Sequence, residues 1–251
     1  MKCNKKYNFV LVILLILSFS KFINAGGPPW RTDDPIPVDF KQHELYLFST
    51  GVSDDGGVSG VGPAVEFNYG IFRNTQFHVV FPLAFDVPKV GEKHFGYGDT
   101  ELGFKYRFVE QTDDIPAIAA CPIAELPTGN QSKNLGNGKA QLYIPIWFQK
   151  DIGKWTVCTG AGYWINPGTD NKNWQFYGLQ VQYNFSDDFF LGAETFHQTA
   201  STVDSDGYTG IHIGGAVTVV PSYQLLFSTD AGNGITSYKH FAYYFGIYHD
   251  F

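Results

Sequence analysis

Charged and amide side chains recur within otherwise apolar stretches of the sequence, and their types could support polar recognition or ion selection. The set comprises Glu66, Glu101, Lys105, Arg107, Glu125, Gln180, Gln182, Glu194 and His212. Such side chains can pair with one another, as buried charges must, or they can form a lining that selects solutes. Both roles stay open from the sequence, and one does not exclude the other.

Motifs of known catalytic and metal sites are absent from the sequence. It contains no G-x-S-x-G, H-E-x-x-H or C-x-x-C pattern and no phosphate-binding loop. Residues 204–207 resemble the start of a calcium loop but lack the downstream glutamate, which favours an ordinary turn. We therefore predict no catalytic residues, no metal and no cofactor. A triad assembled from residues distant in sequence stays open as an alternative.

The first 25 residues are typical of a cleaved export signal. Three lysines precede an unbroken apolar run over residues 9–17, and Ala25 offers a small residue for cleavage. The run is too short for a membrane-spanning helix, which needs about 20 apolar residues. Cleavage would leave 226 residues and remove four lysines, so that 13 bases would face 24 acids, a net charge of −11. This acidity argues against nucleic acid as a partner.

Apolar residues at every second position are the strongest structural signal. Six stretches each present such a face: residues 77–85, 102–108, 142–148, 211–219, 223–227 and 241–251. These six faces hold one histidine and no Asp, Glu, Lys or Arg. The opposite faces carry polar residues mixed with glycine and alanine. A period of two is the pattern of a β-strand, so all nine charged and amide residues named above share the side opposite to the apolar one.

Two folds could use this alternation. In a soluble sandwich the apolar face is the core, whereas in a transmembrane barrel it meets lipid and the polar face lines the lumen. Predicted strands of 10–14 residues exceed the usual ~5–6 of a sandwich. Trp155 and Tyr163 lie ~26 Å apart along one strand, the spacing of two aromatic girdles at membrane interfaces. We therefore predict an all-β fold, an antiparallel up-and-down transmembrane β-barrel of about twelve strands, with ten and fourteen as alternatives.

The predicted chain organisation has three parts: a signal peptide at residues 1–25, an N-terminal segment at the periplasmic mouth over residues 26–39, and the barrel over residues 40–251. Strands are predicted at residues 40–51, 61–71, 75–87, 98–109, 115–127, 139–150, 154–164, 173–185, 188–198, 208–220, 222–231 and 238–251. Short turns alternate with longer polar loops, including residues 53–60, and this pattern places both termini in the periplasm. Cys121 and Cys158 fall two strands apart, roughly 10 Å, so we expect free thiols.

The stretch GGPPWRTDDPIPVDF, residues 26–40, carries a family resemblance through Pro29, Trp30, Thr32, Asp33, Asp34 and Pro35. With a strand containing Glu44 and the Leu-Pro-Thr-Gly run at residues 126–129, it resembles the bacterial outer-membrane transporter family named for the MetA pathway of phenol degradation. That resemblance implies a barrel that passes small molecules, including hydrophobic or aromatic ones. The terminal Phe251 resembles the C-terminal signature of outer-membrane proteins, which implies the barrel-assembly machinery as a partner.

The sequence thus predicts a bacterial outer-membrane channel for passive passage of small solutes, in contact with membrane lipid and without enzymatic activity. A non-transporting structural or surface-interaction barrel is one alternative. A lipid-modifying hydrolase embedded in the barrel is another.

Overall fold

The computed structural model describes residues 28–234 and 239–251. The predicted signal peptide therefore lies outside the described residues. The strands are β1 (His43–Ser53), β2 (Gly57–Phe72), β3 (Thr75–Pro88), β4 (His94–Tyr97), β5 (Thr100–Val109), β6 (Ala117–Ala120), β7 (Ile123–Leu126), β8 (Gln141–Ile152), β9 (Trp155–Ile165), β10 (Trp174–Ser186), β11 (Phe189–Gln198), β12 (Tyr208–Val220), β13 (Tyr223–Gly234) and β14 (Lys239–Asp250). One 3₁₀ turn, η1 (Gln131–Lys133), lies between β7 and β8.

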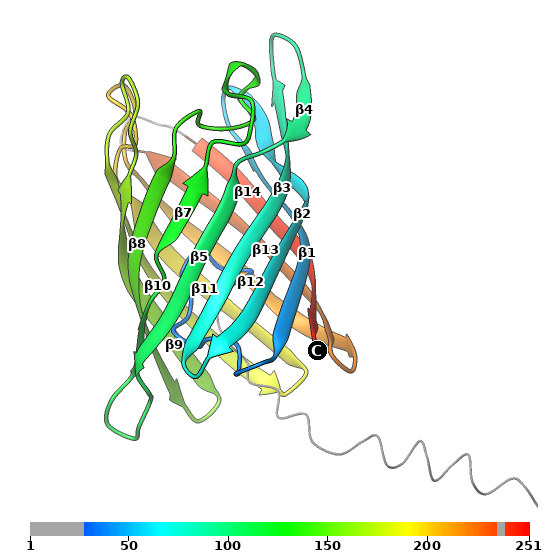
Figure 1. The fold of residues 1–251 in the computed structure, drawn as a ribbon, viewed down its shortest axis with the longest axis vertical. Coiled ribbons are helices and arrows are strands. Elements are labelled where there is room, and N and C mark those ends of the chain that lie inside the picture. Colours follow the sequence, from blue (N-terminus) through cyan, green and yellow to red (C-terminus); the bar gives the residue numbers. More distant parts are fainter. Residues whose placement is uncertain (1–27, 235–238) are drawn as a thin grey trace, which may run out of the picture.

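The strands form one closed wall (Figure 1), and the predicted antiparallel barrel of twelve strands is confirmed. Each strand pairs antiparallel with its neighbours, and β1 closes the barrel by pairing with β14. This seam runs from the Glu44–Asp250 pair to the Ser53–Phe241 pair. The backbones of His43 and Phe251 extend it, since each donates an N–H to the carbonyl of the other, at 2.9 and 3.1 Å.

Two of the twelve barrel strands are each broken into two segments, so the fourteen segments cross the wall only twelve times. The segments β4 and β5 are separated by residues 98–99, and both pair with β3. The segments β6 and β7 are separated at Cys121 and Pro122, and both lie between β5 and β8. Pro122 has no N–H to give to the ladder. Its carbonyl still accepts from Phe104 N–H at 3.1 Å, so the wall stays connected across the break.

The two faces of the wall differ in polarity as the alternation predicts. On β5, Phe104 and Tyr106 point outward and are 50% and 53% exposed, whereas Lys105 between them is 5% exposed. On β12, Ile211 is exposed and the adjacent His212 is buried. Because the outward side is apolar and the inward side carries the charges, the polarity is inverted relative to a soluble protein and matches a wall surrounded by lipid.

The connections differ from the prediction where strands extend into expected loops. One such strand is β4, which lies between the predicted strands at residues 75–87 and 98–109. The glycine-rich residues 53–60 were expected to form a longer loop, but β1 and β2 continue through most of them and leave only residues 54–56 as a turn. Asp54 supports this turn by accepting the N–H groups of Gly56 and Gly57 at 2.7 and 3.1 Å. The start of β1 and the C-terminus lie at the end of the barrel that carries the short turns such as residues 73–74 and 153–154 (Figure 1).

The cysteines follow the prediction. Cys121 and Cys158 are both buried and both free. They lie on barrel strands that are separated by β8. Within the described residues, no helix has the length and apolar character needed to cross a membrane.

A lysine on the outward face tests this placement of the membrane. Ile146 lies in the middle of β8 and is 44% exposed, whereas Ile152 lies at the short-turn end of the same strand and is 61% exposed. Ile146→Lys should lower the free energy of unfolding by about 2–4 kcal/mol, and Ile152→Lys by only ~0–1 kcal/mol, because the cost of a charge depends on its depth in the bilayer. Denaturant unfolding in lipid vesicles measures both, and equal effects of the two lysines would contradict the assignment.

Candidate functional site in the barrel lumen

The N-terminal segment, defined here as residues 28–42, lies inside the barrel. Pro29, Trp30, Thr32, Asp34 and Pro35 are all buried. Parts of the segment are visible through the wall as the blue chain in the lower half of Figure 1. A position at the mouth was expected from the sequence, but the contacts below reach the middle of β11, β12 and β13. The segment enters so deeply because its polar groups find partners there.

Glu194 on β11 holds the deepest part of this segment. One carboxylate oxygen accepts the backbone N–H of Thr32 at 2.6 Å and its hydroxyl at 2.5 Å. The other accepts the N–H of Arg31 at 3.0 Å and the Nδ1–H of His212 at 3.0 Å. Gly178 makes room, because a Cβ there would collide with the Thr32 hydroxyl. A buried carboxylate with four donors is well compensated for its lost hydration.

Arg31 joins the segment to the neighbouring part of the same wall, where β11, β12 and β13 lie side by side. Its guanidinium contacts Asp230 on β13 through both Nε and Nη2, each at 2.9 Å. Its Nη1 donates to the Tyr208 hydroxyl at 3.1 Å, and the guanidinium carbon lies 4.5 Å from the ring centre of Phe196. Both nitrogens contact the same oxygen, Oδ2 of Asp230, and the two contacts together fix the orientation of the guanidinium and pair its charge.

Lys105 on β5 binds the acidic pair that follows. Its Nζ lies 3.0 Å from Asp33 and 3.4 Å from Asp34. Asp34 also accepts the N–H of Ile36 at 2.5 Å, and Asp33 accepts that of Asp34 at 2.8 Å, so the aspartate side chains stabilise a local turn. Burial raises the pKa of the Asp34 carboxyl, whereas the Lys105 ammonium lowers it.

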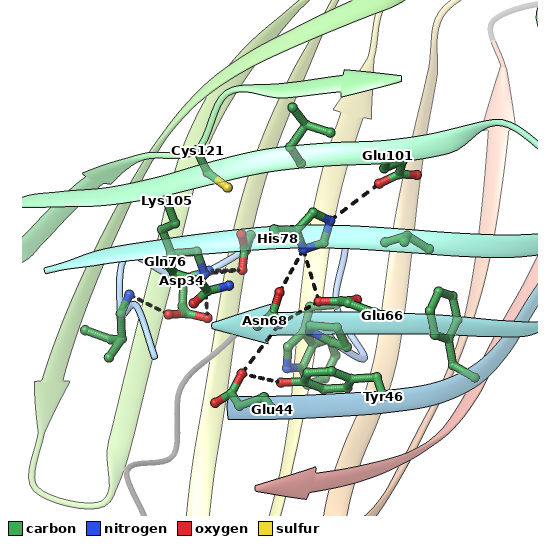
Figure 2. Close-up of a pocket in the computed structure, with 17 residues that line it drawn as sticks. Asp34, Glu44, Tyr46, Glu66, Asn68, Gln76, His78, Glu101, Lys105 and Cys121 are labelled. Carbon is green, nitrogen blue, oxygen red and sulfur yellow. Dashed lines mark hydrogen bonds and ion pairs between the residues drawn. The ribbon is translucent and has the colours of Figure 1, made fainter. Parts of the chain in front are cut away.

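A second network covers the inner faces of β1, β2, β3 and β5 (Figure 2). Asn68 donates to Glu66 at 2.9 Å and to Glu44 at 3.5 Å. His78 lies between two acids, with Nδ1 3.3 Å from Glu66 and Nε2 3.8 Å from Glu101. Its Nδ1 also contacts the Asn68 carbonyl oxygen at 3.0 Å. Since both neighbours of Nδ1 are acceptors, Nδ1 carries a proton.

The structure brings together only part of the set named from the sequence. Six of its members are buried on the inner face: Glu66, Lys105, Gln180, Gln182, Glu194 and His212. The other three are partly exposed, and Arg107 and Glu125 lie toward the ends of the barrel. Arg107 donates to Asn74 at 2.7 Å in a short turn, Glu125 accepts from Asn137 at 2.8 Å beside the long loops, and the side chain of Glu101 is 39% exposed.

Other inner residues escaped the sequence analysis. Arg31 and Asp230, which form the ion pair described above, are two of them. The alternation on β13 places Asp230 on the same inward face as Ser228, so this pattern could have identified Asp230 from the sequence. One part of the lumen is aromatic rather than polar, which was not predicted. Its buried members are Tyr143, Trp147, Phe176 and Phe196, and Trp164 and Trp174 pack against them.

The cavities inside the barrel include two that lie beside the N-terminal segment. The first, called here the acidic cavity, has a volume of about 250 Å³ and is lined by Asp33, Asp34, Glu44, Tyr46, Glu66, His78, Glu101 and Lys105 among others. The second has a volume of about 320 Å³ and is lined by Arg31, Thr50, Val52, His212 and Asp230 among others. Trp30 lines both and thus lies between them.

Loss of Glu194 should release the segment from the wall. Glu194→Ala leaves four donors without their acceptor, and breaking such a buried pair costs about 3–5 kcal/mol. Trypsin should then cut the Arg31–Thr32 bond, which is sheltered inside the native barrel. Mass spectrometry of the fragments measures the cleavage, with Glu110→Ala in an exposed turn as the control. Equal cleavage rates in wild type and Glu194→Ala would show that Glu194 does not hold the segment.

Comparison with known proteins supports the fold. No family model matches the sequence, and no curated protein does. Among solved structures, the COG4313 outer membrane channel from Pseudomonas putida F1 is similar, with a TM-score of 0.70 and 15% identity over 90% of this chain and 99% of that one. The translocator domain of the autotransporter NalP from Neisseria meningitidis gives 0.53 and 12% over 83% and 87%. The KdgM porin in complex with disordered oligogalacturonate gives 0.53 and 9% over 82% and 99%. These likenesses show that the chain has the fold of outer-membrane β-barrels.

Proposed function

We propose that this protein is an outer-membrane channel for the passive passage of small solutes, narrowed by its own N-terminal segment. The observation that carries this proposal is the pair of cavities inside a closed wall, with Trp30 between them. The apolar outer face supports a place in the membrane, and the likeness to outer-membrane barrels favours the bacterial outer membrane.

The dimensions of the lumen favour small solutes. Wide aqueous channels are found in barrels of about 16–18 strands, and a twelve-strand barrel is narrower. Here the N-terminal segment and the aromatic cluster fill much of the remaining space. The acidic cavity of about 250 Å³ is below the ~300–1,000 Å³ of typical ligand pockets. The aromatic cluster is compatible with the hydrophobic or aromatic solutes that the family resemblance implies.

The orientation and assembly of the barrel complete the proposal. Short turns at the end that holds the C-terminus favour a periplasmic position for that end. Phe251 hydrogen-bonds to His43 through its backbone while its side chain stays 55% exposed. An exposed terminal aromatic ring supports its role as a signal for the barrel-assembly machinery.

The same segment gives a second candidate function some weight. A lumen occupied by ion-paired chain would suit a barrel that does not transport and serves a structural or surface-interaction role. The hydrolase alternative gains no such support, because among the described residues no serine side chain hydrogen-bonds to a histidine. Conductance distinguishes a channel from a closed barrel.

Trp30 provides the test. The refolded protein in a planar lipid bilayer should give discrete single-channel current steps. Trp30→Ala should increase the conductance of each step severalfold, because removal of the indole ring joins the two cavities. Trp155→Ala is the matched control, since Trp155 is 49% exposed on the outside of β9 and should leave conductance unchanged. Absence of steps in both wild type and Trp30→Ala, with no solute flux into liposomes, would favour the non-transporting barrel instead.

A further inference from the structure

The acidic cavity carries an excess of negative charge. Five carboxylates line it, those of Asp33, Asp34, Glu44, Glu66 and Glu101. Two side chains that can be cationic line it as well, Lys105 and His78. Because charges inside a narrow barrel must be compensated, the pairing of these seven groups decides what the cavity can accept.

Glu44 is the one of these five carboxylates that forms no ion pair with Lys105 or His78. Lys105 lies against Asp33 and Asp34, and His78 lies between Glu66 and Glu101. The donors to Glu44 are neutral: the hydroxyls of Tyr46 at 3.4 Å and Tyr248 at 3.1 Å, and the Asn68 amide at 3.5 Å. Within the described residues, Glu44 forms no ion pair with a lysine, arginine or histidine.

Trp30, which lines this cavity, is only 8% exposed, and its Nε1 has no hydrogen-bond partner among the described residues. A buried polar group without a partner has lost its hydration and gained no hydrogen bond in return, which is destabilising. The indole N–H can only donate, so an oxygen acceptor on a bound solute would satisfy it. This N–H is an observation independent of the acidic residues.

The remaining wall is aromatic. Trp30, Tyr46 and Phe48 line the cavity beside Glu44, and the Phe48 ring stacks on Tyr244 at 5.4 Å, which limits its movement. Aromatic faces attract both flat apolar groups and cations. The cavity therefore combines one uncompensated carboxylate, an unpartnered N–H donor and an aromatic surface within about 250 Å³.

We propose that the acidic cavity binds a small aromatic amine that also carries a hydroxyl group. The ammonium lies at Glu44, the ring packs on Tyr46, Phe48 and Trp30, and the hydroxyl oxygen accepts from the Trp30 N–H. This proposal deepens the channel function and rests on it for the route by which the solute reaches the cavity.

Three probes that differ only in the charge of one tail test the proposal. Tyramine is the cation, 4-(2-hydroxyethyl)phenol is the neutral compound, and 4-hydroxyphenylacetate is the anion. Isothermal titration calorimetry of the refolded full chain in detergent micelles should show tightest binding for tyramine. Glu44→Gln should weaken tyramine binding about tenfold or more and leave the neutral compound unchanged, because a hydrogen bond to a charged group contributes ~1.5–3 kcal/mol. Glu92→Gln is the control, since the side chain of Glu92 is 93% exposed.

The wild-type series keeps the test decisive even where a variant fails to fold. Equal binding of tyramine and the neutral compound, or tighter binding of the anion, would overturn the proposal. An unchanged tyramine affinity in folded Glu44→Gln would do the same. A barrel that conducts but does not bind tyramine would overturn this proposal and leave the channel function standing. Tyramine binding that depends on Glu44 in a barrel without conductance supports the site while the channel function fails.

Discussion

The constraint on which the rest of the structure depends is the pairing of backbone groups inside a membrane. Lipid offers no hydrogen bonds, so every N–H and C=O at membrane depth needs a partner in the protein. The seam between β1 and β14 meets this requirement, and the bonds between His43 and Phe251 extend it to the last residue. Closure then fixes which side chains face inward, and with them the volume and charge of the lumen.

A closed lumen of this size must be filled by something other than strands. Here the chain fills it with its own N-terminal segment, whose charges match those of the wall. Arg31 faces Asp230, and Asp33 and Asp34 face Lys105. Each of these pairs would leave an expensive isolated charge if the segment withdrew. The polar residues of the wall are therefore the binding partners of the segment.

The sequence predicted the fold well, because a lipid-facing wall excludes charge at every second position. The outward exposure of Phe104 and the burial of Lys105 beside it follow directly from that rule. Alternation specifies the side of the wall but not the height along it, so Arg107 and Glu125 were grouped with Glu194 although they lie near the ends. It also failed where both faces are apolar, since Tyr143 and Trp147 point inward from β8. The depth of the N-terminal segment could not be predicted, because the partners of residues 31–34 in the wall lie 71 to 199 residues away in sequence and leave no local pattern.

The separation between the segment and its partners has a consequence for the order of folding. Pro29, Arg31 and Thr32 precede the first strand, yet their contacts are with β11 and β13, 162 to 199 residues later. Contacts between such distant residues form slowly, because the intervening chain must first be ordered. We therefore expect the first residues of the described chain to be among the last to reach their native positions. Until they do, Glu194 lacks the donors that Arg31 and Thr32 provide.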